Sequence, residues 1–215
     1  MTNGPMKTDD LVAILARDAA ATGPDIHRRL ATAFAVAALA AVALMVPTLG
    51  IRGDIAAAST GMLFPLKILA VATLAVGAMA LVRAASRPEA ELPRGVLVVP
   101  VLVLLVALGH EVATQVPANL STRMIGRFSG VCLIAIPLLG LIPLAAILAA
   151  MREAAPRHAV RAGALAGLAA GAIAATAYGL HCTDDSPPFV VVWYGIAITI
   201  LTGLGALLGR RLLAW

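Results

Sequence analysis

Charged and aromatic residues are scarce in this chain. Of its 215 residues, 13% are charged and 4% are aromatic, whereas 61% are hydrophobic. A soluble domain carries about 25% charged residues, so a chain of this composition cannot cover its own surface with polar groups. The scarcity of charge excludes an ordinary soluble globular protein and predicts that lipid surrounds most of the chain. A charged segment precedes the first apolar run and no small-residue cleavage site follows it, so we expect no cleavable signal peptide.

Long apolar runs are plentiful instead. A membrane-spanning helix takes about 20 residues, and six runs reach or approach that length. The six runs cover residues 30–49, 62–82, 95–114, 128–151, 162–180 and 189–209. The sequence therefore predicts an all-α polytopic membrane protein, a bundle of about six transmembrane helices. Residues 1–29 form a tail, and residues 30–215 form the transmembrane domain.

Lysine and arginine are distributed unequally between the two ends of these spans. On one side only Arg52, Arg123 and Arg127 lie in the connections. The other side, which holds both termini, carries Lys7, Arg17, Arg28, Arg29, Arg83, Arg87, Arg94, Arg152, Arg157, Arg161, Arg210 and Arg211. The positive-inside rule predicts that both termini face the cytoplasm. The net charge of +5 thus reflects orientation signals, and we expect no direct contact with nucleic acid. Lys67, near the outer end of the second span, is expected to extend to the membrane interface.

The tail contains a short amphipathic helix in this interpretation. Its first turn is acidic, which suits the positive end of a helix dipole, and an apolar stripe follows. Helices that lie on anionic lipid are usually rich in Lys and Arg, so a protein groove fits this acidic helix better than the membrane surface does. The predicted partner-binding residues are Lys7, Thr8, Asp9, Asp10, Leu11, Ile14 and Leu15.

Cysteine is nearly absent, and both cysteines fall at one interface. Cys132 lies about one turn into the fourth span and Cys182 lies where the fifth span ends, so both are predicted at the outer face. They are candidates for a disulfide or for binding a soft metal ion, with His181 and Asp184 as possible further ligands. The alternative is that both are small apolar fillers. The sequence has no CxxC or HExxH spacing, and we expect no resident cofactor beyond a transient heavy-metal ion or disulfide.

A stripe of small residues runs along the fifth span. Gly163, Gly167 and Gly171 recur every four residues, a spacing that lets two membrane helices approach closely. We expect this stripe to pack against another helix of the same bundle. The alternative is that it forms the interface of a homo-oligomer.

Three segments resemble a known family. Residues 6–12, MKTDDLV, are similar to the M-K-T-D-D-L-I start of the NrsF family, although five residues precede this motif here. Residues 180–186, LHCTDDS, followed by Phe189 and by the Trp-Tyr-Gly of 193–195, resemble that family's second signature. Residues 205–211, GALLGRR, match its close. The resemblance extends essentially from end to end.

The resemblance implies a bacterial inner-membrane anti-sigma factor with six spans. Its partner would be an extracytoplasmic-function sigma factor of the sigma-F kind, which the tail holds away from RNA polymerase. Metal or oxidative stress outside, read by Cys132 and Cys182 with His181 beside them, would release the sigma factor.

Two other functions fit the sequence less well. A membrane thiol-disulfide oxidoreductase ordinarily needs a CxxC and a second shuttle pair, which two isolated cysteines do not provide. A small transporter needs a polar path at the middle of the membrane, and apart from Lys67 the span centres are apolar. No catalytic residues are assigned, and the chain is not expected to be an enzyme.

Overall fold

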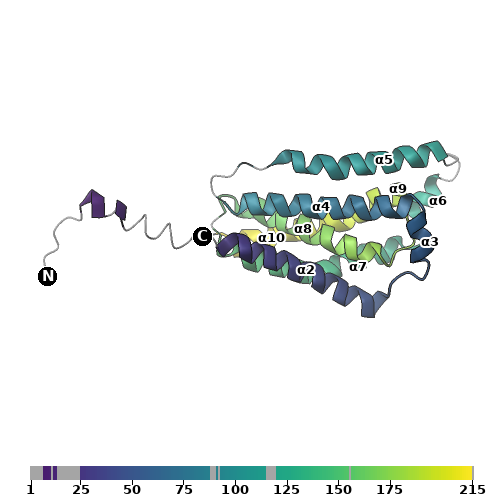
Figure 1. Cartoon of the computed structure of the whole chain (residues 1–215). Helices are drawn as coiled ribbons and strands as arrows, with labels where there is room; N and C mark the ends of the chain where they lie inside the picture. The colour runs from purple at the N-terminus through teal and green to yellow at the C-terminus, as the bar shows by residue number, and fades with distance from the viewer. Residues whose placement is uncertain are drawn as a thin grey trace.

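The computed structural model is a bundle of helices that run along one common axis (Figure 1). It describes residues 7–10, 12–13, 25–87, 91, 93–114, 120–154 and 156–214. Within these ranges all regular structure is helical and no strand occurs. Six helices are long and apolar enough to cross a membrane. These six are Ile26–Leu49, Leu63–Ala85, Gly95–Thr114, Leu120–Met151, Ala159–Gly179 and Pro187–Leu212. The predicted fold class and the number of spans are confirmed.

The elements follow one another in the order that the apolar runs predict. The first four are α2 (Asp25–Leu49), the short α3 (Ile55–Thr60), α4 (Leu63–Ala85) and the 3-10 turn η1 (Arg94–Leu97). The next four are α5 (Val98–Thr114), the short α6 (Leu120–Ile125), α7 (Ser129–Met151) and α8 (Ala159–Gly179). The last span consists of α9 (Pro187–Phe189), the π-helical turn η3 (Val190–Tyr194) and α10 (Gly195–Leu212).

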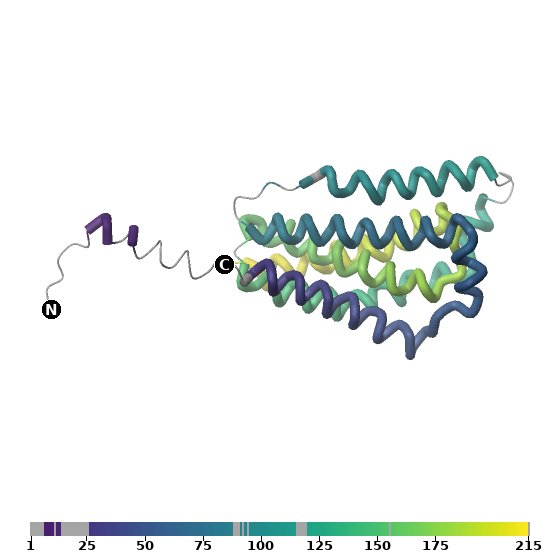
Figure 2. Tube along the Cα trace, viewed as in Figure 1, coloured from purple at the N-terminus to yellow at the C-terminus, as the bar shows by residue number. Residues whose placement is uncertain are grey.

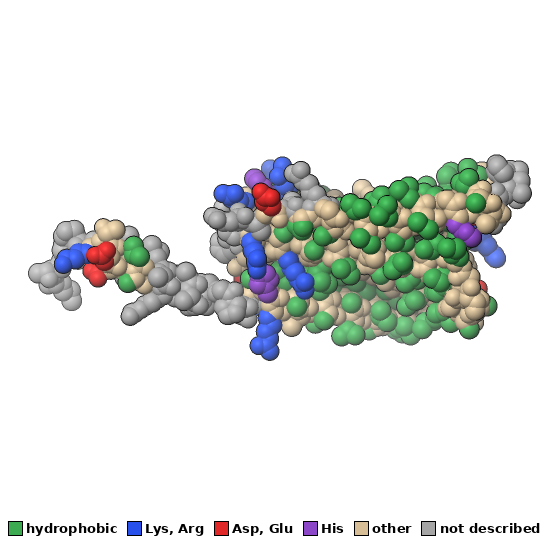
Figure 3. Space-filling model, turned by 45° about the horizontal axis from the view of Figure 1, so that its top comes forward, with side chains coloured by type: hydrophobic (Ala, Val, Ile, Leu, Met, Phe, Trp, Pro, Cys, Tyr) green, Lys and Arg blue, Asp and Glu red, His purple; other side chains and the backbone are tan. Residues whose placement is uncertain are grey.

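The two ends of the bundle differ in what they carry. The start of α2 and the C-terminus lie at the same end, which we call the tail end, whereas α3 and α6 lie at the opposite, far end (Figures 1 and 2). In the space-filling view, Lys and Arg side chains gather at the tail end and hydrophobic side chains extend along the helices (Figure 3). This distribution matches the charge asymmetry in the sequence, on which the predicted orientation depends.

Helix α8 lies at the centre of the bundle and α5 at its edge. Of the most apolar window of each helix, 61% is buried in α8 and 17% in α5. Helix α8 can take this central position because its glycines let the backbone of α10 approach closely. A Cβ atom on Gly163 would lie only 2.2 Å from the Gly205 carbonyl oxygen. A Cβ atom on Gly167 would lie 2.1 Å from the Leu201 carbonyl oxygen. The glycine stripe therefore packs against α10 inside the bundle, as predicted.

Candidate functional site

The candidate site is the connection between α8 and α9 at the far end, residues 180–186, which we call the cysteine loop. Helix α8 ends in a turn in which the His181 and Cys182 amides both donate to the Tyr178 carbonyl. Residues 182–186 then have no regular structure. Pro187 opens the next helix, because its fixed φ suits a first turn and its missing N–H costs nothing there.

The structure brings the two thiols together. Cys132 occupies the first turn of α7, Cys182 lies in the cysteine loop, and both are free and fully buried in one apolar cluster. The Cys132 thiol, which interacts with Cys182, lowers the pKa of Cys182 below its ordinary value, and the positive charge of Lys67 acts in the same direction. The two cysteines thus share one depth, as the sequence predicts. A reagent reaches them only when the surrounding side chains move.

Two tyrosines that the sequence analysis did not single out border the thiols. Tyr178 and Tyr194 are fully buried, and their rings lie 5.8 Å apart. Neither hydroxyl has an oxygen or nitrogen partner at ordinary hydrogen-bond distance among the described residues, and both face the thiol of Cys182, a weak hydrogen-bonding group. A π-helical turn ends at the buried Tyr194, and such turns are frequent at functional sites.

A cluster of charged side chains lies against the cysteine loop. The Lys67 ammonium group lies 2.5 Å from the Asp185 carboxylate and donates to the Cys182 carbonyl at 2.7 Å. The Lys67 ammonium group extends to the connection beyond the end of α8, but it is 3% exposed and ends on protein partners instead of solvent. The physical reason is that Asp185 and the loop carbonyls offer the ammonium group partners inside the protein, which a single span cannot reveal.

Arg52 is the second cation of this cluster. Its guanidinium donates to both oxygens of Asp185 at 2.9 Å, to the carboxylate of Asp54 at 2.7 and 2.9 Å, and to the Cys182 carbonyl at 3.3 Å. The hydrogen bonds and charge of Asp54 and Asp185 raise the pKa of Arg52, and Arg52 in turn lowers the pKa of Asp54. The ring of Phe64 lies 5.1 Å from the guanidinium carbon. Arg52 is thereby fixed in one orientation, facing the loop.

Further contacts hold the rest of the cysteine loop. The Asp184 carboxylate accepts hydrogen bonds from the backbone amides of Arg127 and Phe128, both at 2.9 Å, just before α7 begins. Gly126 makes this approach possible, since its φ is +60° and a Cβ atom there would lie 2.5 Å from the Phe189 ring. The Ser186 hydroxyl donates to Glu111 at 3.4 Å.

The predicted further metal ligands are engaged elsewhere. The imidazole Nδ1 of His181 lies 3.1 Å from the Gly50 carbonyl oxygen, and Asp184 faces the start of α7. Across the part of the chain that the structure describes, no group of three or more His, Cys, Asp or Glu residues is placed to hold a metal ion. Only the two thiols of the predicted ligand set lie side by side, and a metal site there stays a prediction.

Comparison with known proteins places this architecture in a family. The sequence model of NrsF, described as "Negative regulator of sigma F", matches residues 15–215. The chain belongs to the NrsF family. It is 35% identical over 214 residues to a "Probable anti-sigma-F factor NrsF" of Azospira oryzae and 33% identical over 214 residues to the "Anti-sigma-F factor NrsF" of Caulobacter vibrioides. Each alignment covers 98% of this chain and 100% of the relative. No solved structure matches it.

For this NrsF-family chain, the tail is described only in part. Thr8, Asp9 and Asp10 form a helical turn, and with Lys7 they are exposed. The other three predicted partner-binding residues, Leu11, Ile14 and Leu15, lie outside the described residues. The family match begins at residue 15, so the partner-binding role of the tail stays a prediction.

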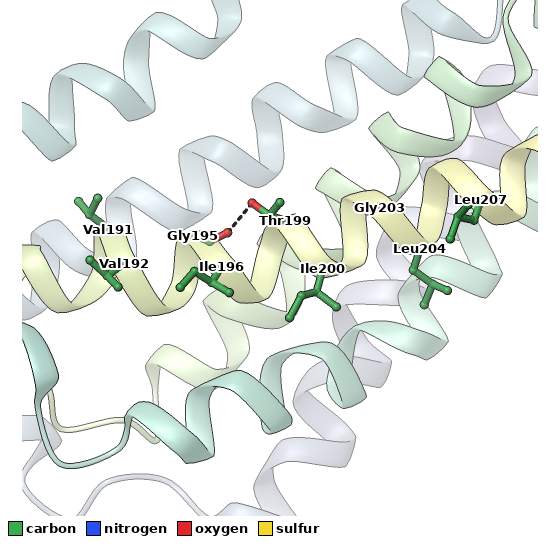
Figure 4. Close-up of a pocket in the computed structure, with 9 residues that line it drawn as sticks. All are labelled: Val191, Val192, Gly195, Ile196, Thr199, Ile200, Gly203, Leu204 and Leu207. Atoms are coloured by element: carbon green, nitrogen blue, oxygen red, sulfur yellow. Dashed lines mark hydrogen bonds between the residues drawn. The ribbon is translucent and has the colours of Figure 1, made fainter.

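A second feature is a shallow apolar groove along the side of the last span that faces away from the bundle (Figure 4). Its lining is apolar except for Thr199, whose hydroxyl donates to the Gly195 carbonyl at 2.7 Å. The groove offers no titratable group among its lining residues.

Proposed function

We propose that this member of the NrsF family is a membrane anti-sigma factor that holds an extracytoplasmic-function sigma factor through its tail. Release follows when the thiol pair of Cys132 and Cys182 reacts with a metal ion or an oxidant. One observation carries the proposal beyond the family description: the only two cysteines of the chain meet in one buried cluster, at the end of the bundle opposite to the tail.

The proposed location is the bacterial inner membrane, with both termini in the cytoplasm. Twelve of the sixteen Lys and Arg residues belong to the side that holds both termini, which supports this orientation. The cysteine loop then faces the outside, where thiols can form disulfides. The tail faces the compartment in which a sigma factor works.

Binding by the tail would be largely electrostatic in its first step. Asp9 and Asp10 are exposed on one helical turn, and carboxylates presented in this way attract a basic partner surface. The apolar residues that follow would then pack into a groove on the sigma factor.

Helix α2 offers a direct path between the two ends. At its outer end, the Gly50 carbonyl oxygen lies 3.1 Å from His181 Nδ1, and the Arg52 amide donates to the Leu180 carbonyl at 3.1 Å. The inner end of α2, at Asp25, continues into the tail. A rearrangement of the cysteine loop would therefore act on the helix to which the tail is joined, by a shift between discrete packing arrangements.

A charge reversal tests the proposed role of the tail. Replacing Asp9 and Asp10 with Lys is expected to free the sigma factor and to raise the sigma-dependent reporter without an inducer, because the charge attraction becomes repulsion. The matched control is Glu91→Lys, an exposed acidic residue in the connection between α4 and η1, which should leave repression intact. Full repression by the double variant would place the binding site elsewhere.

A further inference from the structure

The amide of Cys182 donates to the Tyr178 carbonyl at the end of α8, whereas its carbonyl is held by side chains from other elements. Cys132 is fixed by the α7 helix, where its amide donates to the Phe128 carbonyl at 2.8 Å. Cys182 lies in a segment without helix or strand, and buried carbonyls in such a segment need donors from outside it. The Cys182 carbonyl accepts two hydrogen bonds, from Lys67 Nζ at 2.7 Å and from Arg52 Nη1 at 3.3 Å.

The same two cations also share one carboxylate of the loop. Asp185 lies 2.5 Å from Lys67 and 2.9 Å from Arg52, and its side chain is 18% exposed. Lys67 comes from α4 and Arg52 from the segment after α2. Two separate parts of the chain therefore bind the loop at the same two places, the Cys182 carbonyl and the Asp185 carboxylate.

We propose that Lys67 and Arg52 are positioning residues, which hold the backbone of Cys182 so that its thiol faces Cys132. This inference rests on the proposed function of the thiol pair. The holding group consists of Lys67, Arg52 and Asp185, and we call it the loop clamp.

A purely structural role accounts poorly for the loop clamp. Burying charged groups carries a large desolvation cost, and well-packed apolar residues often stabilise a protein as much as a buried ion pair does. Arg52 also binds Asp54, but the other polar contacts of both side chains are directed at the cysteine loop: each donates to the Cys182 carbonyl as well as to Asp185. Charge at this place therefore fixes the geometry of one loop rather than the packing of the helices.

The reaction that this geometry serves is the joining of the thiols. Two S–H bonds break, one S–S bond forms, and two electrons and two protons pass to an oxidant. In the experiment the oxidant is diamide, an azo compound that is reduced to the hydrazine. Holding reacting atoms in place raises the rate of such a step, and a small misplacement lowers it by a factor of ten or more.

The rate of disulfide formation tests the loop clamp. Membrane vesicles that contain the full chain are treated with diamide, quenched with acid, unfolded in detergent and labelled with a maleimide of high mass. Because the chain has only two cysteines, the gel shift reports the pair directly. Lys67→Met should slow disulfide formation about tenfold or more, and Lys67→Arg, which keeps the charge and the N–H donors, should react clearly faster than Lys67→Met.

Two further variants keep the test decisive. Asp185→Asn preserves the shape of the side chain and removes its charge, so it should slow the reaction as Lys67→Met does, even if the latter accumulates poorly. Arg83→Met, in the last turn of α4 at the opposite end of the helix, should react at the wild-type rate. In chains unfolded before oxidation, all variants should react equally.

Two results would overturn the inference: a wild-type rate in Lys67→Met and Asp185→Asn, or a Lys67→Arg variant as slow as Lys67→Met. The second result would mean that the shape of the lysine side chain, and not its charge, matters. The vesicles contain no sigma factor, so the loop clamp and the proposed function can fail separately. A normal stress response without either cysteine would refute thiol sensing and leave the loop clamp intact.

Discussion

The seam between α8 and α10 allows one prediction to be worked out from the structure. Replacing Gly167 with Ala adds a Cβ atom 2.1 Å from the Leu201 carbonyl oxygen and 2.8 Å from the Thr202 Cα atom. These neighbours are backbone atoms of α10, so no side-chain rotation can relieve the contact. Helix α10 must move away by about 1 Å to restore ordinary van der Waals contact.

The cost of that movement follows from the packing around it. Overpacking a tight interior lowers the free energy of unfolding by roughly 1–3 kcal/mol. The higher helix propensity of alanine relative to glycine raises it by up to about 1 kcal/mol. The separation also opens the neighbouring contact between Gly163 and Gly205, where the backbones touch in the same way. We therefore expect Gly167→Ala to lower the free energy of unfolding by about 1–2 kcal/mol.

The assay is reversible denaturation of the detergent-solubilised protein, followed by circular dichroism. The matched control is Gly203→Ala on the outer face of α10 (Figure 4), because no described atom lies within 4 Å of its Cβ position. This control should be unchanged or more stable by up to about 1 kcal/mol. Equal stability of the two variants would refute the close approach of α8 and α10.

Three further predictions concern topology, the thiols and the turn before α7. A phosphatase that is active only outside the cytoplasm should be active when fused after Ser186 and inactive after Arg87; the reverse pattern would overturn the orientation. Serine at Cys132 or at Cys182 should leave repression normal and abolish the reporter response to metal or oxidant, with no added defect in the double variant; additive partial defects would argue against a pair. Gly126→Ala should lower the melting temperature, because its φ is +60° and the new methyl group would meet the Phe189 ring; an unchanged melting temperature would contradict this.

Hydropathy alone was enough to predict the six spans, since each lipid-facing helix must be apolar along its length. The boundaries were less predictable. The first helix begins at Asp25, five residues before the apolar run at Leu30, because a helix continues through polar residues once its membrane part is formed. The last span contains a π-helical turn at residues 190–194, for which no sequence pattern was identified.

The site was predictable in part. A common depth for Cys132 and Cys182 could be predicted from their places on consecutive spans, but depth alone does not fix the distance between two residues across a bundle. The partners of Lys67 could not be predicted, because Cys182 and Asp185 lie in a distant part of the sequence and only the folded bundle brings them to it. The same holds for Glu111, which is buried and paired with Arg123 across the connection between α5 and α6. Hydropathy reports the depth of a residue and not the neighbours that it meets there.

The most direct test of the proposed function is where the sigma factor resides in the cell. The sigma factor is produced together with the full chain or with a chain that lacks residues 1–23, and the membranes are separated from the soluble fraction. We predict that the full chain retains the sigma factor in the membrane fraction and that the shortened chain, inserted in equal amount, leaves it soluble. Equal retention by both chains would contradict binding through the tail.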